Sequence, residues 1–119
     1  MIRALARTMA AVSIAATLFA CGSASTVPTP DLATVTATSS LAFTPQSVTA
    51  SRNGGAVTVT WVFQSVNHTV TWDSQPATAA AEDIGSTANA SIDRSLTVAG
   101  TYQYHCAIHP SMTGTVVIQ

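Results

Sequence analysis

The chain has 119 residues, enough for one domain, and 47% of them are hydrophobic while only 8% are charged. It contains no lysine, and beyond residue 20 two arginines and five carboxylates leave a net charge of −3. A mildly acidic surface without a basic cluster excludes nucleic acid from the expected partners.

The first segment is typical of a secretory signal. Two arginines lie within residues 1–7, and an apolar run over residues 9–20 is interrupted only by Ser13 and Thr17. This run is shorter than the roughly 20 residues that cross a bilayer as a helix. A basic start, a short apolar stretch and a small final residue predict a signal peptide over residues 1–20. We therefore expect an exported protein, in the bacterial periplasm or at the cell surface.

The end of that segment, Leu18-Phe19-Ala20-Cys21, resembles the bacterial lipobox. The resemblance implies that Cys21 is the first mature residue and is acylated, with the membrane as a partner through the lipid anchor. The alternative is ordinary cleavage nearby, with Cys21 an incidental thiol. Acylation would leave Cys106 as a lone thiol in an oxidising compartment, where a bound metal would protect it.

Composition then divides the rest of the chain into a linker and a domain. Residues 21–40 are rich in Ser, Thr, Ala and Pro and have few bulky side chains, so we predict a flexible, disordered tether. From Leu41 the polar and apolar residues begin to alternate, and Asn53-Gly54-Gly55 indicates a turn. Residues 41–119 are therefore predicted to form the folded domain, as a monomer.

Several segments of this domain alternate with the period of two that indicates β-strands. The residues expected to face inward are Val57, Val59, Trp61, Phe63, His68, Val70, Trp72, Ile92, Leu96, Val98, Tyr102, Tyr104, Cys106, Val116 and Ile118. Residues 75–90 are rich in Ala and show no strand period, so we expect a loop with a short helical turn there. Short strands separated by turns predict an all-β sandwich or barrel.

The residues that carry chemistry lie near the carboxyl end. Cys106, His109 and Met112 offer a thiol, an imidazole and a thioether within seven residues. Soft sulfur ligands favour copper, and two His with one Cys and a distant Met are the donors of a blue-copper site. The second histidine must come from elsewhere, and His68, at the start of an apolar-faced strand, is the candidate.

The sequence around this loop resembles a known family. The run Tyr102-Gln103-Tyr104-His105-Cys106, followed by His109, Met112, Gly114 and Val116, is similar to the carboxy-terminal signature of the plastocyanin and azurin-like cupredoxins. The Cys-x2-His-x2-Met spacing is similar to that of amicyanin.

The resemblance implies a cupredoxin-like Greek-key β-sandwich that binds one copper ion and transfers electrons without bond chemistry. It implies that His68, Cys106 and His109 are equatorial ligands and that Met112 is the weak axial ligand. Plastocyanins commonly have Asn at the position of Thr69, where its side chain braces the cysteine loop.

The expected function is a one-electron Cu(I)/Cu(II) shuttle between an extracytoplasmic redox donor and acceptor. The candidate electron-transfer surface comprises Ile108 and Pro110 beside the His109 ring, and His105, whose ring strand alternation sends to the face opposite Cys106. A small apolar patch there would give a transient complex. An ordinary exposed histidine is the alternative for His105.

Two other functions remain open. The same ligands would serve periplasmic copper storage or delivery, and a structural β-sandwich binding module would contain the His and Cys residues incidentally. Taken singly, Cys106 and Met112 are ordinary core residues. An enzyme is not expected, because four protein ligands leave no open position for a substrate.

Overall fold

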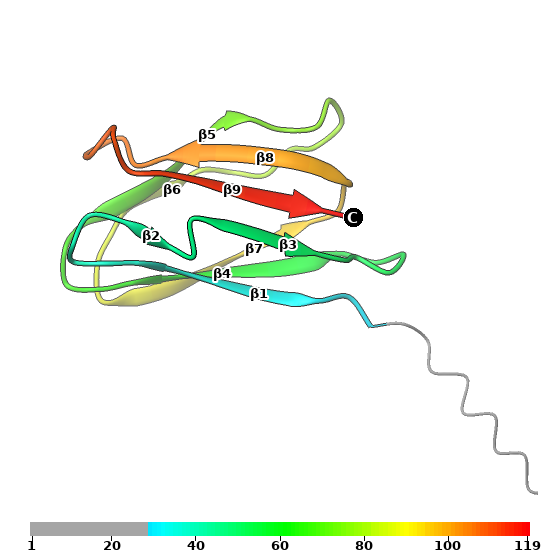
Figure 1. The fold of residues 1–119 in the computed structure, drawn as a ribbon, viewed down its shortest axis with the longest axis horizontal. Coiled ribbons are helices and arrows are strands. Elements are labelled where there is room, and N and C mark those ends of the chain that lie inside the picture. The colour runs from blue at the N-terminus through cyan, green and yellow to red at the C-terminus, as the bar shows by residue number, and fades with distance from the viewer. Residues whose placement is uncertain (1–28) are drawn as a thin grey trace, which may run out of the picture.

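The computed structural model describes residues 29–119, which fold into two packed β-sheets (Figure 1). The first sheet contains β1 (Leu32–Ala37), β2 (Phe43–Thr44), β4 (Val57–Phe63) and β7 (Ala90–Leu96), in the order β2-β1-β4-β7. The second contains β3 (Ser47–Ala50), β5 (His68–Ser74), β6 (Ile84–Thr87), β8 (Gly100–His105) and β9 (Thr113–Ile118), in the order β3-β9-β8-β5-β6. The chain crosses repeatedly between the sheets, so the predicted all-β sandwich is confirmed.

Alternation along the strands explains the core. In β4 every second residue from Val57 to Phe63 is buried. The residues between them, two threonines and Val62, are only half-buried. Tyr102, Tyr104 and Cys106 are buried in the same way along and just after β8. The two apolar faces therefore lie against each other, as a sandwich requires.

Aromatic side chains fill the centre of the core. Tyr104 lies edge-on to Phe43, Trp61 and Trp72, with ring centroids 4.8, 5.6 and 5.4 Å away. Tyr104 precedes Cys106 by two residues and faces the same side of the strand. The aromatic contacts of Tyr104 therefore hold in place the strand that leads to this predicted ligand.

Two predicted boundaries are corrected. Leu32–Ala37, which we expected in a flexible linker, forms β1 and pairs in parallel with β4. Its small inward residues Ala33, Val35 and Ala37 alternate with polar ones and are buried, but their low bulk made the segment look unstructured. Within the expected loop of residues 75–90, Ile84–Thr87 forms β6, and the described residues contain no helix there.

The ends of the described chain lie together, away from the predicted metal ligands. The Asn53 side chain donates a hydrogen bond to the Thr29 carbonyl, and the Arg52 N–H donates one to the Gln119 carbonyl. β9 runs the length of the sandwich between the 106–112 loop and Gln119 (Figure 1). Residues 1–28, with the predicted signal peptide and Cys21, lie outside the described residues. No helix among residues 29–119 has the length and apolar character needed to span a membrane.

Candidate metal centre

Three predicted ligands converge at one end of the sandwich. His68 begins β5, Cys106 follows β8, and His109 lies in the loop between β8 and β9. The Cys106 Sγ atom lies 3.8 Å from His68 Nδ1 and 3.7 Å from His109 Nδ1, and the two Nδ1 atoms are 3.2 Å apart. The fold thus brings His68 next to Cys106 and His109, which follow it by 38 and 41 positions in the sequence.

These distances fit a metal ion. Metal bonds of about 2.0 Å to nitrogen and about 2.3 Å to sulfur, spread at trigonal angles, place donor atoms roughly 3.5–3.8 Å apart. His68 and Cys106 are completely buried, whereas His109 is half-buried. The cluster is therefore protected from solvent except at the edge that His109 provides.

The loop that carries Cys106 and His109 is closed by its own backbone. The Cys106 N–H donates to the Met112 carbonyl at 2.9 Å, and the Met112 N–H donates to the His109 carbonyl at 2.8 Å. Met112 is buried in the same core cluster as Cys106. The three residues that the sequence placed together are thus held as one compact turn.

Partners outside the motif orient the donor atoms. The Thr69 N–H donates to Cys106 Sγ at 3.3 Å, and the Ala107 N–H donates to Thr69 Oγ1 at 2.7 Å. The Nε2 atom of His68 lies 2.9 Å from the Thr38 carbonyl. A backbone carbonyl has no sequence signal, so sequence reasoning could not find Thr38.

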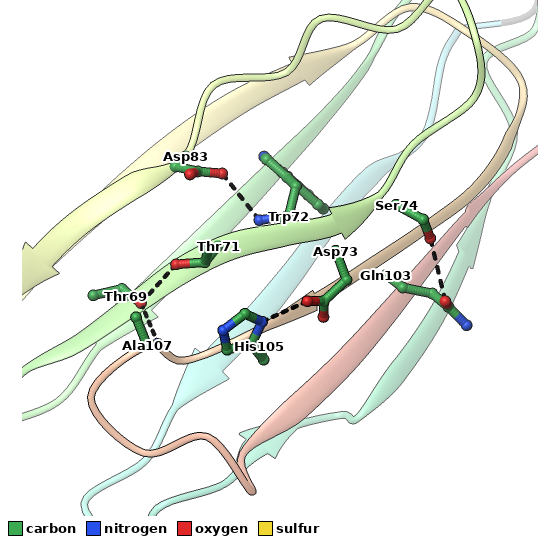
Figure 2. A network of polar contacts seen from close by, with 9 residues as sticks. All are labelled: Thr69, Thr71, Trp72, Asp73, Ser74, Asp83, Gln103, His105 and Ala107. Carbon is green, nitrogen blue, oxygen red and sulfur yellow. Dashed lines mark hydrogen bonds and ion pairs between the residues drawn. The ribbon is translucent and has the colours of Figure 1, made fainter.

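His105 points away from this cluster, as alternation predicted. Its Nδ1 atom lies 2.7 Å from the Asp73 carboxylate, and the two side chains are 28% and 47% exposed (Figure 2). Asp73 was not among the predicted site residues, although its position on the neighbouring strand is the signal that could have found it.

The other predicted surface residues lie beside His109. Ile108 is 46% exposed, and Pro110 is also exposed. Leu41, from the turn after β1, is exposed as well and lines a shallow pocket together with Met112. The apolar surface at this end therefore extends beyond the ligand loop.

Comparisons with known proteins agree with this geometry. The sequence matches the copper-binding proteins of the plastocyanin/azurin family over residues 30–119. No curated protein sequence matches the chain.

Solved structures with the same fold include copper proteins. A variant of amicyanin in its reduced Cu(I) form at pH 4 is similar with a TM-score of 0.59 and 26% identity, over 74% of this chain and 82% of that one. A pseudoazurin from Sinorhizobium meliltoi is similar with a TM-score of 0.55 and 26% identity, over 74% of this chain and 73% of that one. With the family matched over most of the chain and the donor atoms converging, copper is the cofactor, and the chain belongs to the plastocyanin/azurin family of copper-binding proteins.

Proposed function

We propose that this protein is a one-electron carrier whose copper is held by His68, Cys106 and His109, with Met112 as a weak axial ligand. The observation that carries the proposal is the convergence of two imidazole nitrogens and one thiol sulfur within 3.8 Å of one another. Two imidazoles, one thiolate and a thioether are the donors of blue-copper electron-transfer sites. When bound, copper supplies the Cu(I)/Cu(II) couple.

The protein's contribution is to keep the donors in place while the charge changes. The Thr38 carbonyl can only accept a hydrogen bond, so it fixes the proton of His68 on Nε2 and leaves the Nδ1 lone pair facing the cluster. The Thr69 N–H is directed at the thiol sulfur, where it stabilises the thiolate. Because both contacts involve backbone groups of a packed sandwich, little rearrangement is needed on electron transfer.

Electrons would enter and leave through the His109 edge. His109 is the most exposed of the three donors, the exposed residues Ile108 and Pro110 flank it in the loop, and the exposed Leu41 lines a pocket with Met112 of the same loop. A small apolar contact favours weak complexes that separate quickly, as transient redox pairs require. We therefore place the docking surface for a redox donor or acceptor at this end.

The deciding experiment is spectroscopic. Purified protein is titrated with Cu(II), and the visible and electron paramagnetic resonance spectra are recorded for wild type and Cys106→Ser. We expect one copper per chain, an intense visible thiolate-to-copper band and a reversible potential, with the band absent in Cys106→Ser.

Other outcomes would point to the alternatives. A colourless site that releases Cu(I) readily to an acceptor would favour copper storage or delivery. Failure to bind copper stoichiometrically would favour a structural module. Catalytic turnover is not proposed, since four protein ligands leave no position for a substrate.

We also propose export and lipid anchoring through Cys21, on the lipobox-like residues 18–21. Mass spectrometry of the mature protein should find acyl chains on its first residue, Cys21. In Cys21→Ser the protein should leave the membrane fraction, and an unmodified mature end in wild type would contradict the anchor.

A further inference from the structure

The peptide group between Thr38 and Ser39 is held at both of its ends by side chains from another part of the chain. Its carbonyl oxygen lies 2.9 Å from Nε2 of His68, and its N–H donates to Oε1 of Gln64 at 2.8 Å. A trans peptide group is planar, so its carbonyl and its N–H point in opposite directions and rotate together. The hydrogen bond to Gln64 therefore limits the directions in which the Thr38 carbonyl can point.

The donor and the acceptor of each of these two bonds follow from their chemistry. The Ser39 N–H can only donate, so the Gln64 atom that faces it is the amide oxygen. The Thr38 carbonyl can only accept, so His68 Nε2 carries the proton. Hydrogen bonds at the two ends of one peptide group polarise it in the same direction and strengthen each other.

The backbone of Gln64 is itself fixed, although the side chain is exposed. Its N–H donates to the Ala37 carbonyl at 3.0 Å, and its own carbonyl accepts from the Asn89 N–H at 2.9 Å. Gln64 thus joins the β1–β2, β4–β5 and β6–β7 connections, which lie at the same end of the sandwich as the 106–112 loop (Figure 1). Because its backbone is held in place, the side chain loses less conformational freedom when it bonds Ser39.

A second contact joins the same two connections without touching this peptide group. The hydroxyl oxygen of Ser39 lies 3.1 Å from that of Ser65, the residue after Gln64. Removing the Ser65 hydroxyl would loosen the contact between the connections but leave both ends of the peptide group bonded. Ser65 therefore offers a control that separates the packing of the connections from the orientation of the Thr38 carbonyl.

We propose that Gln64 is a positioning residue for His68 and acts through this single peptide group. The hydrogen-bonded series of Gln64, the Thr38–Ser39 peptide and His68 is called the peptide relay below. Without the Gln64 oxygen, the peptide group is free to rotate, and its carbonyl bonds His68 Nε2 less well. The inference rests on the proposed function only in taking His68 as a copper ligand.

The first test uses the copper-free protein, so its result does not depend on metal binding. NMR measures hydrogen exchange at the Ser39 amide, together with the chemical shift and exchange of the His68 Nε2 proton. Gln64→Met and Gln64→Asn remove the acceptor, the first by replacing the amide and the second by shortening the side chain. Gln64→Glu keeps an oxygen at the same reach, and Ser65→Ala is the matched control.

The peptide relay predicts that Gln64→Met and Gln64→Asn speed exchange at the Ser39 amide by roughly three- to tenfold, the effect of losing one net hydrogen bond. In both variants the His68 Nε2 proton should move upfield and exchange faster, because its own hydrogen bond is weaker. Gln64→Glu and Ser65→Ala should keep both exchange rates within about twofold of wild type.

Three results would overturn the peptide relay. The first is equal Ser39 exchange in Gln64→Met and Ser65→Ala. The second is an unchanged His68 proton in a variant whose Ser39 amide exchanges faster. The third is an equal shift of the His68 proton in Ser65→Ala, which would assign the effect to the contact between the connections. If Gln64→Met fails to fold, Gln64→Asn decides in its place.

The second test follows the copper-loaded protein. A hydrogen bond from Nε2 makes an imidazole a stronger metal ligand, which favours Cu(II) over Cu(I). Gln64→Met changes no charge and weakens that bond, so it should raise the reduction potential, while Ser65→Ala should leave it unchanged. An unchanged potential in Gln64→Met would overturn the link to the metal. If wild type binds no copper while the copper-free results hold, the proposed function fails and the peptide relay remains.

Discussion

The Nε2 atom of His68 lies 2.9 Å from the carbonyl oxygen of Thr38, a residue 30 positions earlier, in the turn after β1. That turn is itself closed by hydrogen bonds from the Thr38 N–H to the Ala42 carbonyl and from the Leu41 N–H to the Thr38 carbonyl. The orientation of a buried predicted ligand therefore depends on a turn in the other sheet.

Leu41 makes this turn possible at some conformational cost, which gives the first prediction. Its φ of 61° lies in the left-handed region, which costs a leucine about 1–2 kcal/mol. Leu41→Gly should have a free energy of unfolding within about 1 kcal/mol of wild type, because relief of strain offsets the flexibility of glycine. Leu41→Val should lose about 1–2 kcal/mol, since a β-branched residue is worse there. Urea unfolding measures both, and equal stabilities of the two variants would contradict the argument.

The second prediction concerns Gly114, which lies opposite Tyr104 in the β8–β9 pairing. A Cβ atom at Gly114 would meet the phenol ring of Tyr104, and Phe43 and Trp61 prevent that ring from moving. Gly114→Ala should lower the free energy of unfolding by about 1–3 kcal/mol. Gly85→Ala is the matched control, because a Cβ there meets nothing within 4 Å. Similar thermal stability of the two variants would show that the ring is mobile.

The third prediction is a pH dependence above pH 10. Burial raises the pKa of Tyr104 from 10.0 to about 12, although the nearby Trp61 indole acts in the opposite direction. The unfolded chain ionises near pH 10 while the folded protein keeps the neutral phenol, so the stabilisation is complete below pH 10 and is lost as pH rises to 12. The loss at this residue approaches about 3 kcal/mol.

Tyr104→Phe is the control for this loss of stability at high pH. The Tyr104 hydroxyl and the Trp61 indole N–H are buried and have no hydrogen-bond partner among the described residues. Removing the hydroxyl should therefore leave stability at pH 7 nearly unchanged or slightly higher. Stability measured from pH 9 to 12 should decline less steeply in Tyr104→Phe, and an identical decline would assign the effect to other groups, such as Tyr102.

The fourth prediction is that copper stabilises the folded domain by binding to the cluster of His68, Cys106 and His109, and not to other groups of the chain. Free copper at 100 times its dissociation constant should add about 2.7 kcal/mol to the free energy of unfolding. His68→Ala and Cys106→Ser should lose most of this increment in calorimetry with and without copper. His105→Ala, which removes a histidine outside the cluster, should retain it. A full increment in Cys106→Ser would place the metal elsewhere.

The fifth prediction separates the two candidate electron routes. Asp73 fixes the His105 ring at the surface between β5 and β8, next to the residue that carries the sulfur. His105→Ala should slow electron transfer to a partner that docks on this face, while Ile108→Ser should slow transfer to one that docks at the His109 edge. Stopped-flow rates at equal ionic strength measure both. Unchanged rates for His105→Ala with every partner would remove the second route.

The fold could be predicted where side-chain bulk and alternation agree. The strands around Trp61, Tyr102 and Ile118 combine large inward residues with threonine or other polar neighbours, and their inward faces are confirmed. β1 was missed because alanine fills two of its three inward positions, and a small side chain carries little hydropathic contrast. Its burial depends on pairing with β4, which is information that the local sequence does not contain.

The same distinction applies to the candidate site. The family, the β-sandwich and copper were recognisable from Cys106, His109 and Met112, whose spacing is local. The assignment of individual ligands remains a prediction, as does acylation of Cys21. Thr38 could not be predicted, because its contribution depends on a backbone carbonyl, which every residue has. Asp73 was missed, although its place on the strand next to His105 could have indicated it.

The placement of Thr29 and Gln119 beside the Arg52–Asn53 turn has a practical consequence for voltammetry. The six residues of β9 separate that end from the ligand loop by about 20 Å. A protein fixed to an electrode through a cysteine added after Gln119 would hold its redox centre too far away for rapid tunnelling. Adsorption of the Ile108 edge onto a thin alkanethiol monolayer would instead leave only that layer between the His109 ring and the electrode.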